Sequence, residues 1–150
     1  LQRLQLQAQV RVADALHVDD WWDGQAFDAI LLDAPCSASG IVRRHPDVRW
    51  LRRDSDIQQL AQLQQQLLRR LWPLLRPGGR LLYATCSVFR AEGEQSLQSF
   101  VAYNTQAHPL PSWGHLRPQN AATPQALVDN LTGDHDGFYY ALLERARSDA

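Results

Sequence analysis

Hydrophobic and polar positions follow two patterns along the chain, one typical of strands and one typical of helices. A continuous apolar run at residues 27–32 predicts a strand buried on both faces. Alternation at residues 9–13 predicts a short strand, and residues 80–85 and 137–143 predict two more. Residues 104–136 are rich in Pro, Asn and Gly, which predicts mostly loop.

Helical periodicity occupies the stretches between these strands. Residues 1–6 have the pattern of the end of a helix, and a long helix is predicted from Asp54 or Ser55 to a stop at residues 77–79, with Pro73 distorting its last turn. Its apolar stripe repeats at the helical period: Ile57, Leu60, Ala61, Leu67, Leu68, Leu71, Leu74 and Leu75. Another helix is predicted at residues 91–103, where Glu92 and Glu94 suit the N-terminal dipole. This alternation predicts an α/β fold with a parallel sheet, in one domain over residues 1–150.

Composition narrows the class of protein. Hydrophobic residues make up 45% and charged residues 21%, which is typical of a globular chain. A net charge of −1 excludes a strongly basic nucleic-acid coat protein, and no apolar run is long enough to span a membrane. Two cysteines cannot form a disulfide framework, which favours a reducing, cytoplasmic location. The absence of Met leads us to expect the carboxy-terminal piece of a longer protein.

The candidate chemistry collects at the carboxyl ends of the predicted strands. Asp14, Asp33, Cys36 and Cys86 each lie at or just beyond such an end. Open α/β sheets bind ligands at this edge, so we expect the two thiols and two carboxylates to converge on one crevice. The alternative is that both thiols are small buried hydrophobes and both carboxylates are loop caps.

At this point the motifs resemble a known family. Residues 33–40 (DAPCSASG) and 84–87 (ATCS), about fifty residues apart, resemble the two signature loops of RNA cytosine-5 methyltransferases. Residues 43–47 (RRHPD) and 133–141 (GDHDGFYYA) look like that family's flanking segments. More narrowly, the chain resembles the bacterial Sun (Fmu) type, which methylates small-subunit ribosomal RNA.

The resemblance implies a Rossmann-like S-adenosylmethionine-dependent methyltransferase fold and a division of roles. It makes Cys86 the thiol that attacks C6 of cytosine, because C5 is a poor nucleophile until a thiolate adds to C6. It implicates Cys36 in release of the product. Asp33 corresponds to an aspartate at the cofactor and the target base, and Asp14 to one that contacts the cofactor.

The family pattern is incomplete in this chain. The glycine-rich cofactor loop and the first two strands of the family fold have no counterpart, since Gly24 is isolated. In the usual strand order this absence leaves a gap in the sheet with unpaired edges. We therefore expect the chain alone to bind the cofactor poorly, to turn over little or not at all, and to have a tendency to self-associate.

RNA contacts are predicted beside the first signature loop. By resemblance and by charge, Arg43, Arg44 and His45 are the candidate RNA-binding residues, although a solvated basic face is an alternative. Trp21 and Trp22 are expected to cover an apolar edge of the core. The histidines show no metal-ligand spacing, so no metal site is predicted.

Three other functions compete with ribosomal RNA methylation. A non-catalytic RNA-binding scaffold would keep the fold and the arginines, but it has no need of thiols at strand ends. A transfer RNA cytosine-5 methyltransferase would use the same chemistry. A thiol hydrolase or redox protein is disfavoured because the sequence has no C-x-x-C pair.

Overall fold

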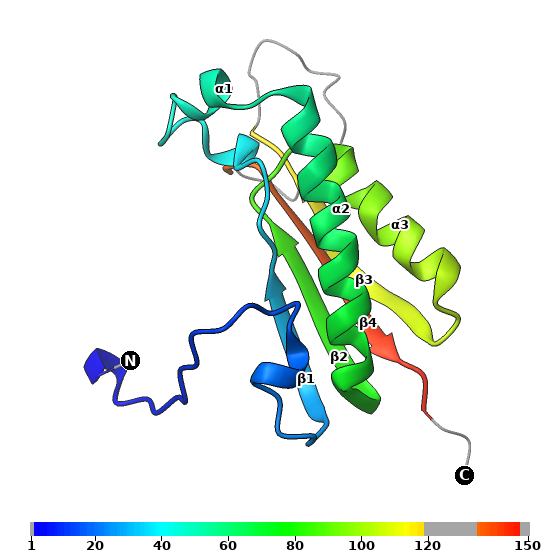
Figure 1. Cartoon of the computed structure of the whole chain (residues 1–150). Helices are drawn as coiled ribbons and strands as arrows, with labels where there is room; N and C mark the ends of the chain where they lie inside the picture. The colour runs from blue at the N-terminus through cyan, green and yellow to red at the C-terminus, as the bar shows by residue number, and fades with distance from the viewer. Residues whose placement is uncertain (1, 119–134, 148–150) are drawn as a thin grey trace.

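The computed structural model describes residues 2–118 and 135–147. Its centre is a four-stranded sheet in the order β1-β2-β4-β3, with two helices on one face (Figure 1). The strands are β1 (Phe27–Asp33), β2 (Leu75–Thr85), β3 (Ala107–Leu116) and β4 (Phe138–Arg145). The helices are α1 (Val48–Leu51), α2 (Asp54–Leu71) and α3 (Glu94–Tyr103).

The long helix α2 has its N-cap at Arg53, one residue before the first of the two caps that the sequence favours. Asp54 is the first helical residue, and the Asp56 carboxylate accepts the N–H of Arg53 at 2.9 Å. The helix ends at Leu71, and a 3-10 turn, Trp72–Leu74, follows because Pro73 cannot continue the α-helical hydrogen bonds.

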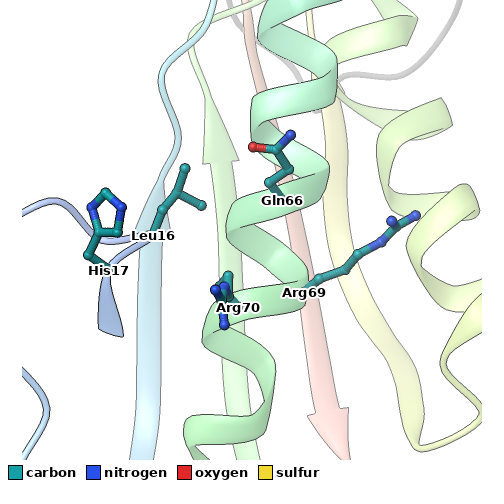
Figure 2. A pocket seen from close by; sticks show the side chains of 5 residues that line it. All are labelled: Leu16, His17, Gln66, Arg69 and Arg70. Atoms are coloured by element: carbon teal, nitrogen blue, oxygen red, sulfur yellow. The ribbon is translucent and has the colours of Figure 1, made fainter. Parts of the chain in front are cut away.

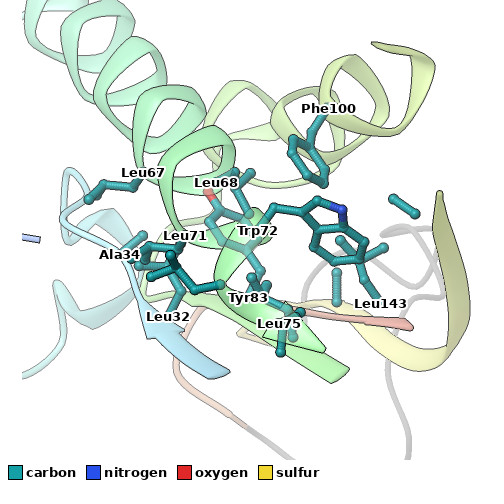
Figure 3. Packing of buried hydrophobic residues seen from close by; sticks show 14 of the residues in the cluster. Leu32, Ala34, Leu67, Leu68, Leu71, Trp72, Leu75, Tyr83, Phe100 and Leu143 are labelled. Atoms are coloured by element: carbon teal, nitrogen blue, oxygen red, sulfur yellow. The ribbon is translucent and has the colours of Figure 1, made fainter. Parts of the chain in front are cut away.

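The hydrophobic core lies between the helices and the sheet (Figure 3). Leu68 of α2 and Leu81 of β2 are fully buried there. Trp72 packs edge-on against Phe100 of α3, with ring centroids 5.4 Å apart. Leu67, Leu68 and Leu71 of the predicted stripe therefore face the core as expected, whereas Leu74 and Leu75 lie beyond α2, in the 3-10 turn and in β2.

The sheet is mixed, which corrects the expectation of a parallel sheet. β1 and β2 pair in parallel, whereas β4 runs antiparallel to both of its neighbours, β2 and β3. A crossover helix enforces parallel pairing only between β1 and β2, where α2 makes the connection. The α/β class is confirmed, with an antiparallel half added to it.

One strand falls where the sequence predicts loop. β3 lies inside residues 104–136, and it carries Pro109 and Pro111. Proline has no N–H to donate, so it fits only a strand that has a neighbour on one side. Within the described residues β3 is such an edge strand, paired with β4 alone. Residues 119–134 of this stretch lie outside the described residues.

The strand predicted at residues 9–13 does not form. Val10 and Val12 are exposed, and the segment has no regular structure. An alternating pattern needs a neighbouring strand to hydrogen-bond with, and no strand pairs with this segment in the described sheet. The prediction that β1 is buried on both faces is also wrong, since Leu31 is 68% exposed.

Three smaller boundaries differ from the sequence expectation. β2 begins at Leu75 instead of residue 80, and its register with β1 is irregular there, where Gly78 adopts φ +75°. The helix predicted at residues 91–103 is split into a 3-10 turn, Arg90–Glu92, and α3. Within the described part of the first predicted helical stretch, the structure has a 3-10 turn, Gln2–Leu4.

No helix within the described residues is long and apolar enough to cross a membrane.

Candidate active site

The two cysteines meet at one edge of the sheet. Cys36 follows β1 and Cys86 follows β2, and the parallel pairing of these strands sets their ends side by side. The two Sγ atoms lie 3.3 Å apart, and both thiols are free and half-buried. The predicted convergence of the thiols is confirmed.

The thiol of Cys36 is held in its protonated form. Burial is the main cause that raises the pKa of Cys36 from 9.0 to about 12, the hydrogen bond with Cys86 acts in the same direction, and the backbone at Ala38 acts in the opposite one. At neutral pH this residue is therefore a neutral S–H that can donate to the sulfur of Cys86.

A close backbone approach holds together the two cysteine loops (residues 33–40 and 84–87) and the residue that precedes β4. Gly40 donates its N–H to the carbonyl of Cys86 at 2.9 Å, and its own carbonyl accepts the N–H of Gly137 at 2.8 Å. A Cβ at Gly40 would lie 1.8 Å from the Gly137 carbonyl oxygen, so no larger residue fits without moving the backbone. Two glycines thus allow three segments to meet beside the thiols.

A buried carboxylate lies beneath both loops. Glu92 is fully buried in the 3-10 turn before α3, and it accepts hydrogen bonds from Ser37 and Ser87. The sequence interpretation gave Glu92 a role at the N-terminus of a helix. The structure corrects this, because α3 begins only at Glu94.

Polar groups from α2 and β2 complete this buried network. Gln64 donates from Nε2 to the carbonyl of Pro35 at 2.9 Å. The Tyr83 hydroxyl lies 2.9 Å from Gln64 Oε1 and 2.8 Å from the Glu92 carbonyl oxygen, both of which are acceptors. Burial raises the pKa of Tyr83 well above its ordinary value, so its hydroxyl remains a donor.

The two predicted aspartates lie outside this network. Asp33 ends β1 and is exposed. Asp14 sits in a turn, where its carboxylate accepts the N–H of Leu16 at 2.9 Å and lies 3.3 Å from His17 Nδ1. Asp33 is thus three residues from Cys36, whereas the hydrogen bonds of the Asp14 carboxylate are local.

The predicted RNA-binding residues follow the first cysteine loop and are exposed. Arg43 lies 3.3 Å from the Asp136 carboxylate, and Arg44 also forms an ion pair with it. His45 is exposed, with its backbone N–H bonded to the carbonyl of Ile41 at 2.9 Å. The two arginines therefore also hold the segment before β4 against the first cysteine loop.

A separate hollow of about 350 Å³ lies away from the thiols, between residues 16–17 and α2 (Figure 2). It is lined by Leu16, His17, Gln66, Arg69 and Arg70. None of these residues is a predicted catalytic group, so the candidate site rests on the two cysteine loops. Within the described part of the chain, no group of three or more His, Cys, Asp or Glu residues could hold a metal ion.

Sequence reasoning missed the buried polar support of the site. Two signals pointed to it. Each cysteine is followed by a serine, so the same hydroxyl donor stands next to each thiol in the sequence. Gln64 also falls on the apolar stripe of α2, where a polar residue needs a buried partner.

Comparison with known proteins matches almost the whole chain to one family. The profile of the 16S rRNA methyltransferase RsmB/F family matches residues 1–144. The chain is similar to the ribosomal RNA small subunit methyltransferase B of Yersinia enterocolitica, with 48% identity over 145 residues. The match covers 95% of this chain and 32% of the relative, so the chain spans about a third of the length of that protein.

Solved structures agree with this match. The crystal structure of PH0851 has a TM-score of 0.76 and 30% identity, over 96% of this chain and 32% of the other. The methyltransferase homologue from Pyrococcus horikoshii has a TM-score of 0.63 and 28% identity, over 89% of this chain and 43% of the other. The mixed sheet with its helices is thus the corresponding portion of methyltransferase folds.

Proposed function

Because the chain belongs to the 16S rRNA methyltransferase RsmB/F family, we propose that it carries the thiol chemistry for methylating C5 of a cytosine in small-subunit ribosomal RNA. The methyl donor is S-adenosylmethionine. The observation that carries this proposal is the 3.3 Å separation of Cys36 Sγ and Cys86 Sγ at the carboxyl ends of two parallel strands. A scaffold has no need of two thiols in contact at a ligand-binding edge.

The proposed reaction begins with the thiolate of Cys86. Its sulfur forms a bond to C6 of the cytosine, and the electrons move into the ring and make C5 nucleophilic. C5 then takes the methyl group that the bound cofactor supplies. A base removes the C5 proton, the bond between C6 and sulfur breaks, and Cys86 leaves as a thiolate.

The role proposed for Cys36 follows from its protonation state. With its pKa raised to about 12 by burial, Cys36 keeps its proton at neutral pH. Its S–H lies within hydrogen-bond distance of the Cys86 sulfur and stabilises the negative charge that returns to that sulfur on elimination. This fits a function in product release.

Asp33 and Asp14 are the proposed cofactor-contacting residues. Both are exposed, and carboxylates suit the positively charged sulfonium and the hydroxyls of S-adenosylmethionine. Asp33 also lies close enough in sequence to Cys36 to hydrogen-bond the target base. Its place at the end of β1 supports this role, because ligands bind beyond that end.

Arg43, Arg44 and His45 are the proposed RNA contacts. They are exposed next to the first cysteine loop, and guanidinium groups bind phosphate in two-pronged geometry. Arg43 and Arg44 already share Asp136.

The proposal is tested by trapping the covalent intermediate. The protein is a chimera in which this chain replaces the matching third of the Yersinia enterocolitica relative, incubated with S-adenosylmethionine and unmodified small-subunit RNA. Denaturing gels are expected to show that Cys36→Ala accumulates a protein–RNA adduct. The double variant with Cys86→Ala is expected to show none.

Two further arms decide between the alternatives. If the chimera transfers no methyl group and forms no adduct while the unaltered relative does both, the scaffold function replaces the proposed one. Unmodified transfer RNA is offered to the chimera in place of small-subunit RNA, because a transfer RNA cytosine-5 methyltransferase is the alternative with the same chemistry. The 150-residue chain alone is expected to methylate little or not at all, and robust methylation by it would contradict that expectation.

A further inference from the structure

Glu92 occupies a position that the proposed chemistry has not used. Its side chain is fully buried, so it has no contact with solvent. It belongs to a 3-10 turn at Arg90–Glu92, outside both cysteine loops. Its carboxylate nevertheless contacts the residue after each thiol.

The contacts converge on the two carboxylate oxygens. Ser37 donates its N–H to Oε1 at 2.7 Å and its hydroxyl to Oε2 at 2.5 Å. Ser87 donates its hydroxyl to the same Oε2 at 2.6 Å. Both serines are fully buried. One oxygen atom therefore joins the residues that directly follow Cys36 and Cys86.

This arrangement requires a carboxylate. Four donors point at the two oxygens, the fourth being Gln64 Nε2 at 3.4 Å from Oε1, and a carboxylate is purely an acceptor when ionised. Hydrogen bonds to an ionised acceptor are shorter and stronger than neutral ones, which agrees with the distances of 2.5–2.7 Å. Glutamine has the same shape, but its amide NH₂ would face one of these donors. A buried donor would then lose its acceptor.

We propose that Glu92 is a positioning residue that clamps the two cysteine loops together and so keeps the two thiols in contact. It acts through Ser37 and Ser87, and it takes no part in bond making. Its effect on methylation rests on the function proposed above. Its effect on the separation of the thiols does not.

The test measures thiol proximity in the 150-residue chain without any substrate. Diamide oxidises two neighbouring thiols to a disulfide and takes up the two protons and two electrons itself. Loss of free thiol over time, followed by mass spectrometry, gives the rate of the Cys36–Cys86 cross-link. Glu92→Gln is expected to slow this rate by about tenfold, because lost hydrogen bonds let the loops separate.

Glu94→Gln is the matched control. It makes the same chemical change two residues away, at a partly exposed side chain whose carboxylate pairs with Arg90 at 2.9 Å. Its cross-linking rate is expected to stay within about twofold of the wild type. If folded Glu92→Gln, checked by circular dichroism, also cross-links within twofold of the wild type, Glu92 does not position the thiols.

A second variant decides the matter if Glu92→Gln fails to fold. Ser87→Ala removes one donor to Glu92, together with the contact to Ser39 Oγ and the acceptor of the Phe89 N–H, and leaves the carboxylate bonded to Ser37. It is expected to slow cross-linking by about threefold, while Ser99→Ala on the exposed side of α3 leaves the rate unchanged. A wild-type rate in Ser87→Ala overturns the proposal in that case.

The chimera separates this inference from the proposed function. There, Glu92→Gln is expected to lower kcat while the KM for RNA stays the same, because the clamp sets the thiols and not the RNA-binding surface. A chimera without methyl transfer would refute the proposed function and leave the cross-linking result to judge Glu92. A fall in kcat/KM caused by KM alone would count against the clamp.

Discussion

The cysteine loops and the outer edge of β1 are opposite cases within the same sheet. At the loops, the polar groups of Ser37, Ser87 and Glu92 are fully buried and bonded to one another. In β1, Leu31 is 68% exposed. Val12, in the irregular segment that comes earlier in the chain, is fully exposed. Beside the thiols, the buried polar groups are therefore hydrogen-bonded to one another, whereas within the described residues no strand pairs with β1 on the side away from β2.

The two regions differ in how many neighbouring strands the described sheet gives them. The thiols depend on β1, β2 and β4, which hydrogen-bond to one another in the order β1-β2-β4. β1 has an apolar sequence typical of a central strand, yet among the strands that the structure describes it pairs only with β2. The two regions can therefore be perturbed separately, and in several cases by the same substitution in each.

The largest effect is expected at Cys36. Because burial raises its pKa to about 12, its thiolate fraction at pH 9 should be roughly a thousandfold below that of a thiol of ordinary pKa. Its alkylation by iodoacetamide should therefore stay slow at pH 9 and rise as the pH approaches 12. Mass spectrometry of the alkylated peptide gives the rate. The same chain in urea is the control, and equal rates in both states at pH 9 would show that the loop is open.

A methyl group at Gly40 should be the most disruptive change to the loop region. The added Cβ meets the Gly137 carbonyl oxygen at 1.8 Å, so Gly40→Ala forces two backbones apart and should cost about 3–4 kcal/mol of unfolding free energy. Gly24 lies in the segment before β1, and a Cβ added there would have no atom within 4 Å. Gly24→Ala should therefore cost only the strain of its φ of +86°, about 1–2 kcal/mol. Urea unfolding compares the two variants, and equal losses would remove the contrast.

Truncation of a leucine to alanine should lower the unfolding free energy in the core but not at the exposed face of β1. Leu68 of α2 is fully buried in the core, so Leu68→Ala should lower the unfolding free energy by about 3 kcal/mol. Leu31→Ala should change it by less than about 0.5 kcal/mol, because its side chain is already exposed. Thermal and urea unfolding measure both. A large loss in Leu31→Ala would mean that the β1 edge is covered in solution.

The smallest effect concerns association of the chain with itself. An exposed apolar strand edge invites pairing, so the isolated chain should self-associate, and Leu31→Lys should weaken that association by a few fold. Sedimentation velocity at several concentrations measures it. His108→Lys places the same charge at an exposed position on the other edge strand, β3, and should leave association unchanged. If both variants behave alike, the β1 edge is not the contact.

Local patterns predicted the parts of the fold that depend on local physics. The apolar run before Asp33, the stripe of α2 and the strand before Cys86 are all present, because each pattern needs only one packed face. The positions of both cysteines at the carboxyl ends of predicted parallel strands led to the predicted convergence of the thiols, which the structure confirms. These features require no knowledge of distant partners.

The remaining features depend on partners far along the chain. β3 was missed because Pro109 and Pro111 are tolerated only once the strand is known to be an edge. The strand at residues 9–13 was predicted wrongly because its pattern shows a need for a neighbour and not the neighbour itself. Glu92 and Gln64 were missed because their burial depends on hydrogen bonds between separate segments. The roles of Asp14, Asp33 and the three RNA-contact candidates stay predictions.

The strand order also dictates a sequence of events during synthesis. β4 follows β3 along the chain, yet it lies between β2 and β3 in the sheet. β1, α2 and β2 can assemble as soon as they leave the ribosome, whereas β3 emerges with no strand to pair with. It must wait for β4, and the Gly137–Gly40 contact beside the thiols forms with β4. The candidate active site is therefore among the last parts of the described fold to take shape in a growing chain.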